Sequence, residues 1–256
     1  YKKWPTVINM LEAHNPSIAT QVIADWKYIN DIADAGGFPA DKNIYYSYAD
    51  FNGVWADTDQ AVTDKTVALI SGAKADTPTF LFSYQVQVDE AGHSYGGGSA
   101  EYKQAVINVG DNIGEIMDAV KASGLPWTVL VTTDHGHQQS RALGHGFQSP
   151  NETSSFIIYD RAGDPSGGLQ NQSYSNVDVT PTIVSLFGAP LRSDFDGVSM
   201  DTKASGIVTP VDLKTSLNNA VSMIGYPNIG TDIALGTRTV FATVPYAVSY
   251  THLRAH

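Results

Sequence analysis

The residues best suited to chemistry are aspartates and histidines that follow two short apolar runs, 80–88 and 129–133. They are Asp89, His93, Asp134, His135 and His145. Imidazole nitrogen and carboxylate oxygen, without sulfur, suit zinc, manganese or iron better than calcium or magnesium. Two such ions about 4 Å apart can stabilise both the attacking and the departing oxygen of a displacement at phosphorus. The sequence therefore predicts a metal site with hydrolytic chemistry.

These five residues divide into two sets. Asp89, His93 and His145 supply three protein ligands and leave a fourth position open, which is typical of catalytic rather than structural zinc. Asp134 and His135 supply only two ligands for a second ion, so that site is short of ligands. The sequence thus indicates one complete site and part of another.

Strands and helices alternate along the chain, which explains how these residues would meet. Short apolar runs predict strands at 20–24, 80–88, 129–133 and 155–159, with 43–48 as strand or loop. Amphipathic or capped stretches predict helices at 5–13, 25–35, 57–73, 99–124 and 177–187. This order predicts an α/β fold with a mostly parallel central sheet and helices on both faces. The carboxyl ends of parallel strands form the edge where ligands bind.

Glycines decide the local structure that we expect around two of the ligands. Gly92 and the glycines at 96–98 favour a loop after the run 80–88. We therefore expect Asp89 and His93 to lie in a loop and not on one face of a helix. The runs 129–133 and 155–159 are continuously apolar, so we expect strands that are buried on both faces. We expect His137 beside the site or in solvent, and not as a ligand.

Composition limits the partners. The chain has 256 residues, 42% of them hydrophobic, with a net charge of −11 and no cysteine. This charge argues against a nucleic-acid groove or an anionic membrane surface, although a metal ion would still attract an anionic substrate. No apolar run approaches the roughly 20 residues that span a bilayer. The absence of cysteine excludes disulfides and thiolate metal sites.

The two ends of the chain differ from its middle. The first residue is Tyr1, with no signal pattern. Residues 203–248 are rich in Thr, Gly and Asn, and we interpret them as the start of an appended, β-rich module with carbohydrate contact as one role. Residues 249–256 resemble non-native read-through and are left out of the functional interpretation. Residues 1–202 then form the main domain.

Three motifs in order carry a family resemblance. They are D-x-x-G-H at 89–93, T-D-H-G at 133–136 and G-H-G at 144–146. They resemble the metal motifs of the alkaline phosphatase superfamily, in particular its nucleotide pyrophosphatase/phosphodiesterase-like branch. The stretches 177–183 and 196–199 are similar to the C-terminal core of that family. The resemblance covers roughly residues 4–200 and implies an alkaline-phosphatase-like fold.

The resemblance implies a metal-dependent hydrolase with two zinc ions, or manganese in their place. Asp89, His93 and His145 would bind one ion, and Asp134 with His135 the other. The substrate would be a small-molecule phosphoester or a nucleotide. Members of this type are commonly exported, so the resemblance implies a periplasmic or secreted protein.

The resemblance also implies which parts of the mechanism the chain lacks. The family completes its second metal site with an Asp and a nucleophilic Thr or Ser, both upstream of Tyr1. We therefore expect 1–202 to be an incomplete hydrolase domain, inactive as given, with no catalytic nucleophile of its own. Tyr84 is the candidate substrate contact, since some members stack a Tyr on the substrate base; a tyrosine packed on the strand face is the alternative.

Other functions stay open. A phosphomonoesterase or a sulfatase could use the same scaffold. A non-catalytic surface protein with a structural metal site is a candidate from another class. The glycines at 96–98 lack the Lys-Ser/Thr of a phosphate-binding loop, and the G-x-S-x-G motif of serine hydrolases does not occur.

Overall fold

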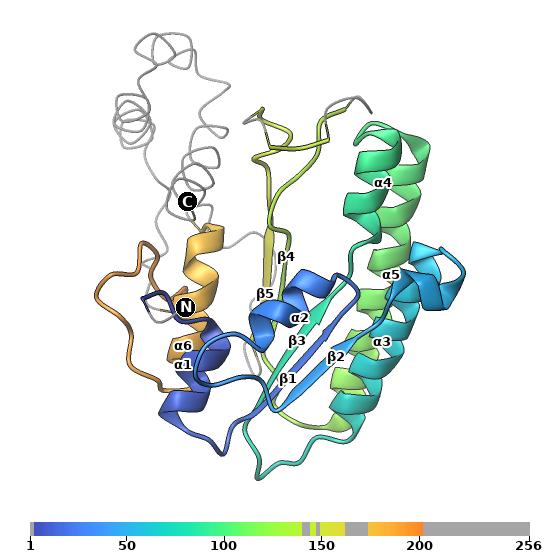
Figure 1. Ribbon diagram of the computed structural model, residues 1–256. Coiled ribbons are helices and arrows are strands. Elements are labelled where there is room, and N and C mark those ends of the chain that lie inside the picture. The colour runs from blue at the N-terminus through green and yellow to red at the C-terminus, as the bar shows by residue number, and fades with distance from the viewer. Residues whose placement is uncertain (1–2, 140–143, 147–148, 162–173, 202–256) are drawn as a thin grey trace, which may run out of the picture. The chain divides into compact units, whose positions relative to one another are not determined.

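The computed structural model describes residues 3–139, 144–146, 149–161 and 174–201 (Figure 1). The chain forms two compact units. Among the described residues, the first unit takes 3–127, 139, 144 and 183–191. The second takes 128–138, 145–146, 149–161, 174–182 and 192–201. Each unit is built from segments that are far apart in the sequence.

A parallel sheet of three strands forms the centre of the first unit. Its order is β2-β1-β3, made by β1 (Ala19–Ala24), β2 (Lys42–Tyr45) and β3 (Thr79–Tyr84) (Figure 1). Val22, Ile23 and Ala24 of β1 are completely buried. Because consecutive side chains of a strand point to opposite faces, both faces of β1 are covered. The predicted α/β class with a parallel sheet is confirmed.

Helices of the first unit pack on this sheet directly or on one another. They are α1 (Val7–His14), α2 (Lys27–Ala33), α3 (Trp55–Ser71), α4 (Gln87–Tyr95) and α5 (Ala100–Ser123), with a short 3-10 helix at Tyr48–Phe51. The first three contact β1, and α5 packs along α3. Ser99 caps α5 by accepting a hydrogen bond from the backbone N of Tyr102 at 3.0 Å, and Gly124 ends it in a left-handed conformation. The helix predicted at 99–124 is therefore confirmed.

The expectation of a loop at Asp89 and His93 was wrong. Both residues lie in α4, which starts at Gln87, so β3 also ends earlier than the predicted run 80–88. One glycine inside a helix costs only about 1 kcal/mol, and Gly92 is tolerated there. The carboxylates of the first turn interact favourably with the positive end of the helix dipole. The glycines at 96–98 follow the helix and end it.

The second unit contains a two-stranded antiparallel sheet. Its strands β4 (Val129–Thr132) and β5 (Ile157–Asp160) pair with Val129 opposite Asp160. Both strands occur near their predicted positions. The expectation of burial on both faces was wrong, because exposed and half-buried residues alternate along β5 and Ile158 is 55% exposed. An antiparallel pair can leave one face in solvent, which a parallel strand between helices cannot.

A buried aspartate organises the C-terminal part of the second unit. A 3-10 helix (η2, Asn176–Asp178) leads directly into α6 (Val179–Leu186), as the sequence predicts for 177–187. The carboxylate of Asp178 accepts hydrogen bonds from the backbone N of Ser175 and of Val198, both at 2.9 Å. Asp178 therefore links the start of this helix to the segment around residue 198.

Two further predictions concern other parts of the chain. The predicted module at 203–248 and the tail at 249–256 lie outside the described residues. In the part of the chain that the structure describes, no helix has both the length and the apolar character that a bilayer crossing requires.

Candidate metal centre

The first unit carries an aspartate and a histidine on one face of α4. Asp89 and His93 are four residues apart, so they lie one helical turn from each other. Nε2 of His93 is 3.4 Å from Oδ2 of Asp89. Asp89 is half-buried and His93 is exposed. A nitrogen and an oxygen at this spacing, with one side accessible to solvent, fit two ligands of one transition-metal ion.

The start of α4 is fixed by a carboxylate from another helix. Its N-cap residue, Val86, has no oxygen in its side chain that could accept a hydrogen bond. Asp59 of α3 supplies one, because it accepts from the backbone N of Val86 at 3.2 Å and from Nε2 of Gln87 at 2.8 Å. Oε1 of Gln87 accepts in turn from Nδ2 of Asn108 on α5, at 3.0 Å. The turn that leads to Asp89 is thus tied to α3 and α5.

A second carboxyl group stands next to Asp59. Asp25 follows β1 directly and is 1% exposed. Burial, together with the neighbouring carboxylate of Asp59, raises the pKa of Asp25 from its ordinary value of 3.8 to about 10. Burial also raises the pKa of Asp59, against the hydrogen bonds that it accepts. Asp25 therefore keeps its proton at neutral pH.

Gly144 lies against the imidazole of His93 within the first unit. Its φ is +57°, a left-handed conformation that favours glycine, and a Cβ there would be 2.9 Å from Nδ1 of His93. A side chain at position 144 would push the His93 ring away. This contact explains why a glycine precedes His145.

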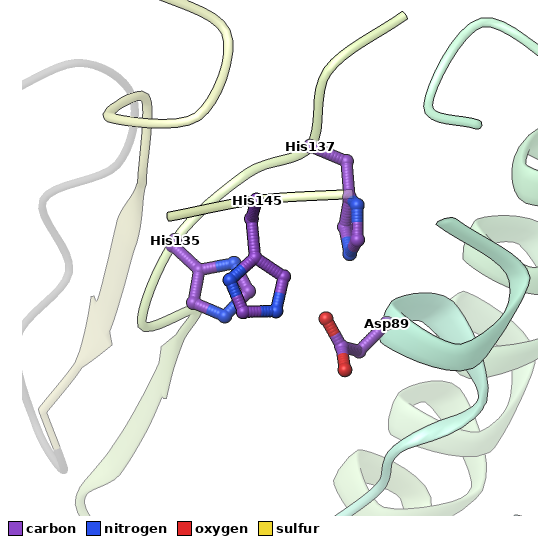
Figure 2. Close-up of side chains that lie close together, drawn as sticks. All are labelled: Asp89, His135, His137 and His145. Carbon is purple, nitrogen blue, oxygen red and sulfur yellow. The ribbon is translucent and has the colours of Figure 1, made fainter. Parts of the chain in front are cut away.

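Three histidines of the second unit converge. Their ring centroids are 3.9 Å apart for His135 and His145, 5.1 Å for His137 and His145, and 5.8 Å for His135 and His137. One nitrogen of each ring lies within 4.8 Å of a nitrogen of each of the others. We call this group the three-histidine cluster. Figure 2 shows its rings, drawn together with Asp89 of the first unit.

An asparagine positions the end of β4, where the cluster begins. Nδ2 of Asn176 donates to the backbone oxygens of Thr133 at 2.9 Å and of Asp134 at 3.1 Å. The carboxylate of Asp134 accepts from the backbone N of His135 at 2.9 Å. These bonds fix the two peptides that lead into the cluster. A segment without helix or strand acquires a defined path by this means.

A buried glutamate holds the next residues of the same segment. The backbone oxygen of Glu152 accepts from the backbone N of Gly136 at 2.8 Å, and its carboxylate accepts from Nε2 of Gln138 at 3.0 Å. A Cβ at Gly136 would be only 2.1 Å from the backbone oxygen of Asn151, so only glycine fits there. The residues on both sides of His137 are therefore anchored to Glu152.

The structure brings some predicted ligands together and adds one residue. Asp89 and His93 form a pair in the first unit, and His135 and His145 meet in the second. The grouping of His145 with Asp89 and His93 joins residues of both units and stays a prediction. Sequence reasoning placed His137 outside the ligand set, although a histidine two residues after another can reach the same point; this spacing was the available signal.

Tyr84, the candidate substrate contact, is the last residue of β3. Its ring stacks on Trp26 with centroids 6.0 Å apart and an interplanar angle of 26°. Trp26 is 40% exposed and also contacts Tyr28 edge to face at 5.4 Å. The carboxyl ends of β1 and β3 therefore carry adjoining aromatic rings. The substrate role of Tyr84 remains a prediction.

Comparison with known proteins identifies the family. A family model described as type I phosphodiesterase / nucleotide pyrophosphatase matches residues 13–158, which is more than half of the chain. The chain therefore belongs to this family, as the resemblance of its three motifs implies. It is also 33% identical over 88 residues to a protein named alkaline phosphatase PhoD from Zymomonas mobilis subsp. mobilis. This match covers 33% of the chain and 15% of that relative.

Proposed function

We propose that the protein is a metal-dependent phosphoric ester hydrolase that acts on phosphodiesters or on nucleotide pyrophosphate bonds. Family membership supports hydrolysis at phosphorus. The observation that carries metal dependence is the convergence of three imidazoles in the second unit, directly after β4. Imidazole clusters without sulfur suit catalytic transition metals.

The proposed metal ligands are the five residues that the sequence indicates: Asp89, His93, Asp134, His135 and His145. Zinc suits this donor set best, with manganese as the alternative. The resemblance supports two ions in the complete domain. When bound, they would supply Lewis acidity toward the phosphoryl oxygens. The grouping of His145 with Asp89 and His93 is supported by the resemblance of the three motifs.

The aromatic rings at the ends of β1 and β3 support a role in substrate binding. A flat nucleobase or an aromatic leaving group can stack on Tyr84 or Trp26, each interaction contributing about 1–3 kcal/mol. The proposed nucleophile is a Thr or Ser, as the resemblance implies. The assay of this proposal uses the full-length protein.

The proposal is tested by turnover of bis(4-nitrophenyl) phosphate, before and after chelation of metal. Asp134→Ala is expected to reduce turnover by at least the roughly 10- to 100-fold that the loss of an outer metal partner costs. Asp160→Ala removes an equally exposed acid at the end of β5 and is expected to leave turnover unchanged. Unaltered turnover in Asp134→Ala, or in the chelated protein, would contradict the proposal.

The same assay discriminates between the open alternatives. The name of the PhoD relative favours a phosphomonoesterase, which would prefer 4-nitrophenyl phosphate, and a sulfatase would prefer 4-nitrophenyl sulfate. A structural metal site predicts that chelation unfolds the protein and that none of these substrates is hydrolysed. Export to the periplasm or the medium is also a proposal, and cell fractionation tests it.

A further inference from the structure

We infer that Asp59 is a positioning residue for the proposed metal ligand Asp89. It accepts the hydrogen bond at the start of α4 that a carboxylate at position 89 could itself accept, and so leaves the carboxylate of Asp89 to the metal ion. This inference rests on the metal dependence proposed above, with Asp89 and His93 as ligands of one ion. All three residues belong to the first unit.

Asp89 stands at a position where a helix can use a carboxylate for its own cap. It is the third residue of α4, which follows the N-cap residue Val86. In a capping box, the side chain at this third position accepts a hydrogen bond from the backbone N–H of the N-cap residue. The chain itself contains an example, because Asp178 is the third residue of η2 and accepts from the backbone N of the N-cap residue Ser175 at 2.9 Å. An aspartate at this position can therefore be drawn to the cap.

In α4 this bond is made by a residue of another helix. The backbone N–H of Val86 donates to Oδ1 of Asp59 at 3.2 Å, and Nε2 of Gln87 donates to Oδ2 of Asp59 at 2.8 Å. Asp59 is 0% exposed and Val86 is 2% exposed, so water does not compete for this bond. A carboxylate at this end of α4 also interacts favourably with the helix dipole. Asp59 thus does for α4 what Asp178 does for η2.

The exchange of roles has a consequence for the metal ion. Without Asp59, the backbone N–H of Val86 would be buried without its acceptor, which is unfavourable. The carboxylate of Asp89, one helical turn away, would then be shared between this N–H and the ion. Metal affinity should fall by about the factor that one hydrogen bond contributes, which is about 5-fold.

A neighbouring bridge provides a matched control. Nε2 of Gln85 donates to Oγ1 of Thr63 on α3 at 3.0 Å, and Oε1 of Gln85 accepts from Nδ2 of Asn112 on α5 at 2.9 Å. This bridge joins the same two helices and is equally close to α4 in the sequence. Gln85 precedes the N-cap residue, however, so the bridge does not involve the N–H groups of α4. Its loss should lower stability and leave Asp89 in place.

The test measures zinc binding to the full-length protein by competition with a chromophoric chelator. Asp59→Ala is expected to weaken the binding of one ion about 5-fold, while a second ion keeps its affinity. Asp59→Asn keeps an oxygen that accepts from Val86 and is expected to restore binding. Thr63→Val breaks the control bridge and should leave zinc affinity unchanged. Asp59→Val keeps the branched shape of the side chain without an acceptor, and it replaces Asp59→Ala if the alanine variant does not fold.

A double-mutant cycle in the metal-free protein separates this role from ordinary structural support. Asp89→Ala should cost more stability in the Asp59→Ala background than in the unsubstituted chain, because Asp89 takes over the cap only when Asp59 is absent. Urea unfolding followed by tryptophan fluorescence measures the four free energies. Additive effects of the two substitutions would overturn the inference.

Three results of the zinc titration would also overturn it. They are undiminished affinity in the folded alanine or valine variant, an equal loss in Thr63→Val, and no recovery in Asp59→Asn.

These readouts are independent of turnover, so the two proposals fail separately. A chain that hydrolyses nitrophenyl phosphoesters but binds zinc equally well in Asp59→Ala keeps its proposed function and loses this role of Asp59. A chain whose zinc affinity falls in Asp59→Ala but which hydrolyses no phosphoester keeps the role of Asp59 and loses the function.

Discussion

In α4, backbone hydrogen bonds of a single helical turn set the distance between Asp89 and His93, whereas the three-histidine cluster lies on segments described without helix or strand. The helix needs few external anchors, the Asp59 carboxylate at its first turn and the Asn108 amide on Gln87. The cluster needs several, and they are the side chain of Asn176 and both the backbone and the side chain of Glu152.

The difference indicates where metal binding is vulnerable. A regular helix keeps the i, i+4 spacing of its ligands after one anchor is lost, because its backbone bonds remain. A segment without regular structure changes its backbone conformation when a single anchoring hydrogen bond or close contact is removed. Substitutions of the residues that anchor the cluster should therefore reduce zinc affinity more than substitutions of the residues that anchor α4.

The largest effect is expected from Gly136→Ala. The new Cβ would approach the backbone oxygen of Asn151 to 2.1 Å, so the segment that carries the cluster must move. We expect the zinc affinity to fall on the order of 100-fold and the free energy of unfolding to fall by about 1–3 kcal/mol. Isothermal titration with zinc and urea unfolding measure the two quantities.

Gly110→Ala is the matched control for this substitution. Gly110 lies in α5, and a Cβ at this position would have no neighbouring atom within 4 Å. Alanine there should therefore stabilise the helix by up to about 1 kcal/mol and leave zinc binding unchanged. Equal behaviour of the two alanine variants would show that the path through position 136 does not matter to the cluster.

A smaller effect is expected from Asn176→Ala. It removes the amide that donates to the backbone oxygens of Thr133 and Asp134, and we expect zinc affinity to fall about 10-fold. Asn176→Asp should be worse than alanine, because a carboxylate would face the same two carbonyl oxygens without a proton to donate. Competition with a chelator measures the zinc affinity of both variants. If Asn176→Asp binds zinc as tightly as the unsubstituted chain, Asn176 does not position the cluster.

The smallest effect on zinc binding is expected from Asp25→Asn, which changes the pH dependence of stability instead. Asp25 has a raised pKa in the folded state, so its favourable contribution is complete below about pH 4 and is lost as pH rises toward about 10. The free energy of unfolding of the first unit should therefore fall with pH, by at most about 1.4 kcal/mol per pH unit for one proton. Asparagine stays neutral, so the variant should show a flatter profile.

Tryptophan fluorescence measures this prediction selectively. All four tryptophans of the chain, at positions 4, 26, 55 and 127, belong to the first unit. Urea unfolding followed by this signal at pH 5, 7 and 9 gives the slope for each protein. An equally steep slope in Asp25→Asn would remove Asp25 as its source. Zinc affinity at pH 7 should be the same in both.

Sequence patterns predicted the fold well where local signals and burial agree. β1 is a short apolar run with both faces covered, and α5 has a serine cap, a long amphipathic repeat and a terminal glycine. Around α4 the signals disagree, because Gly92 favours a loop while the carboxylates at 89 and 90 favour a helix start. Packing and the hydrogen bonds to Asp59 favour the helix, and neither can be predicted from the neighbouring residues in the sequence.

The site was predictable in its residue types more than in its grouping. Motif spacing indicated Asp89, His93, Asp134, His135 and His145, and the structure pairs Asp89 with His93 in one unit and His135 with His145 in the other. His137 was placed outside the set, although its spacing of two residues from His135 was a signal that it could reach the same point. Its position depends on the contact of Gly136 with residue 151 and on Glu152, partners 14 or 15 residues away in the chain.

The interleaving of the two units has a consequence for biosynthesis. The chain alternates between the units in six segments, and the first unit is completed only by residues 183–191. Phe187 from that last segment packs edge to face on Phe80 of β3, with ring centroids 6.3 Å apart. On the ribosome, about a hundred further residues must therefore emerge after β3 before the core around the N-terminal sheet is complete. During this interval the nascent chain is exposed to aggregation and to chaperones.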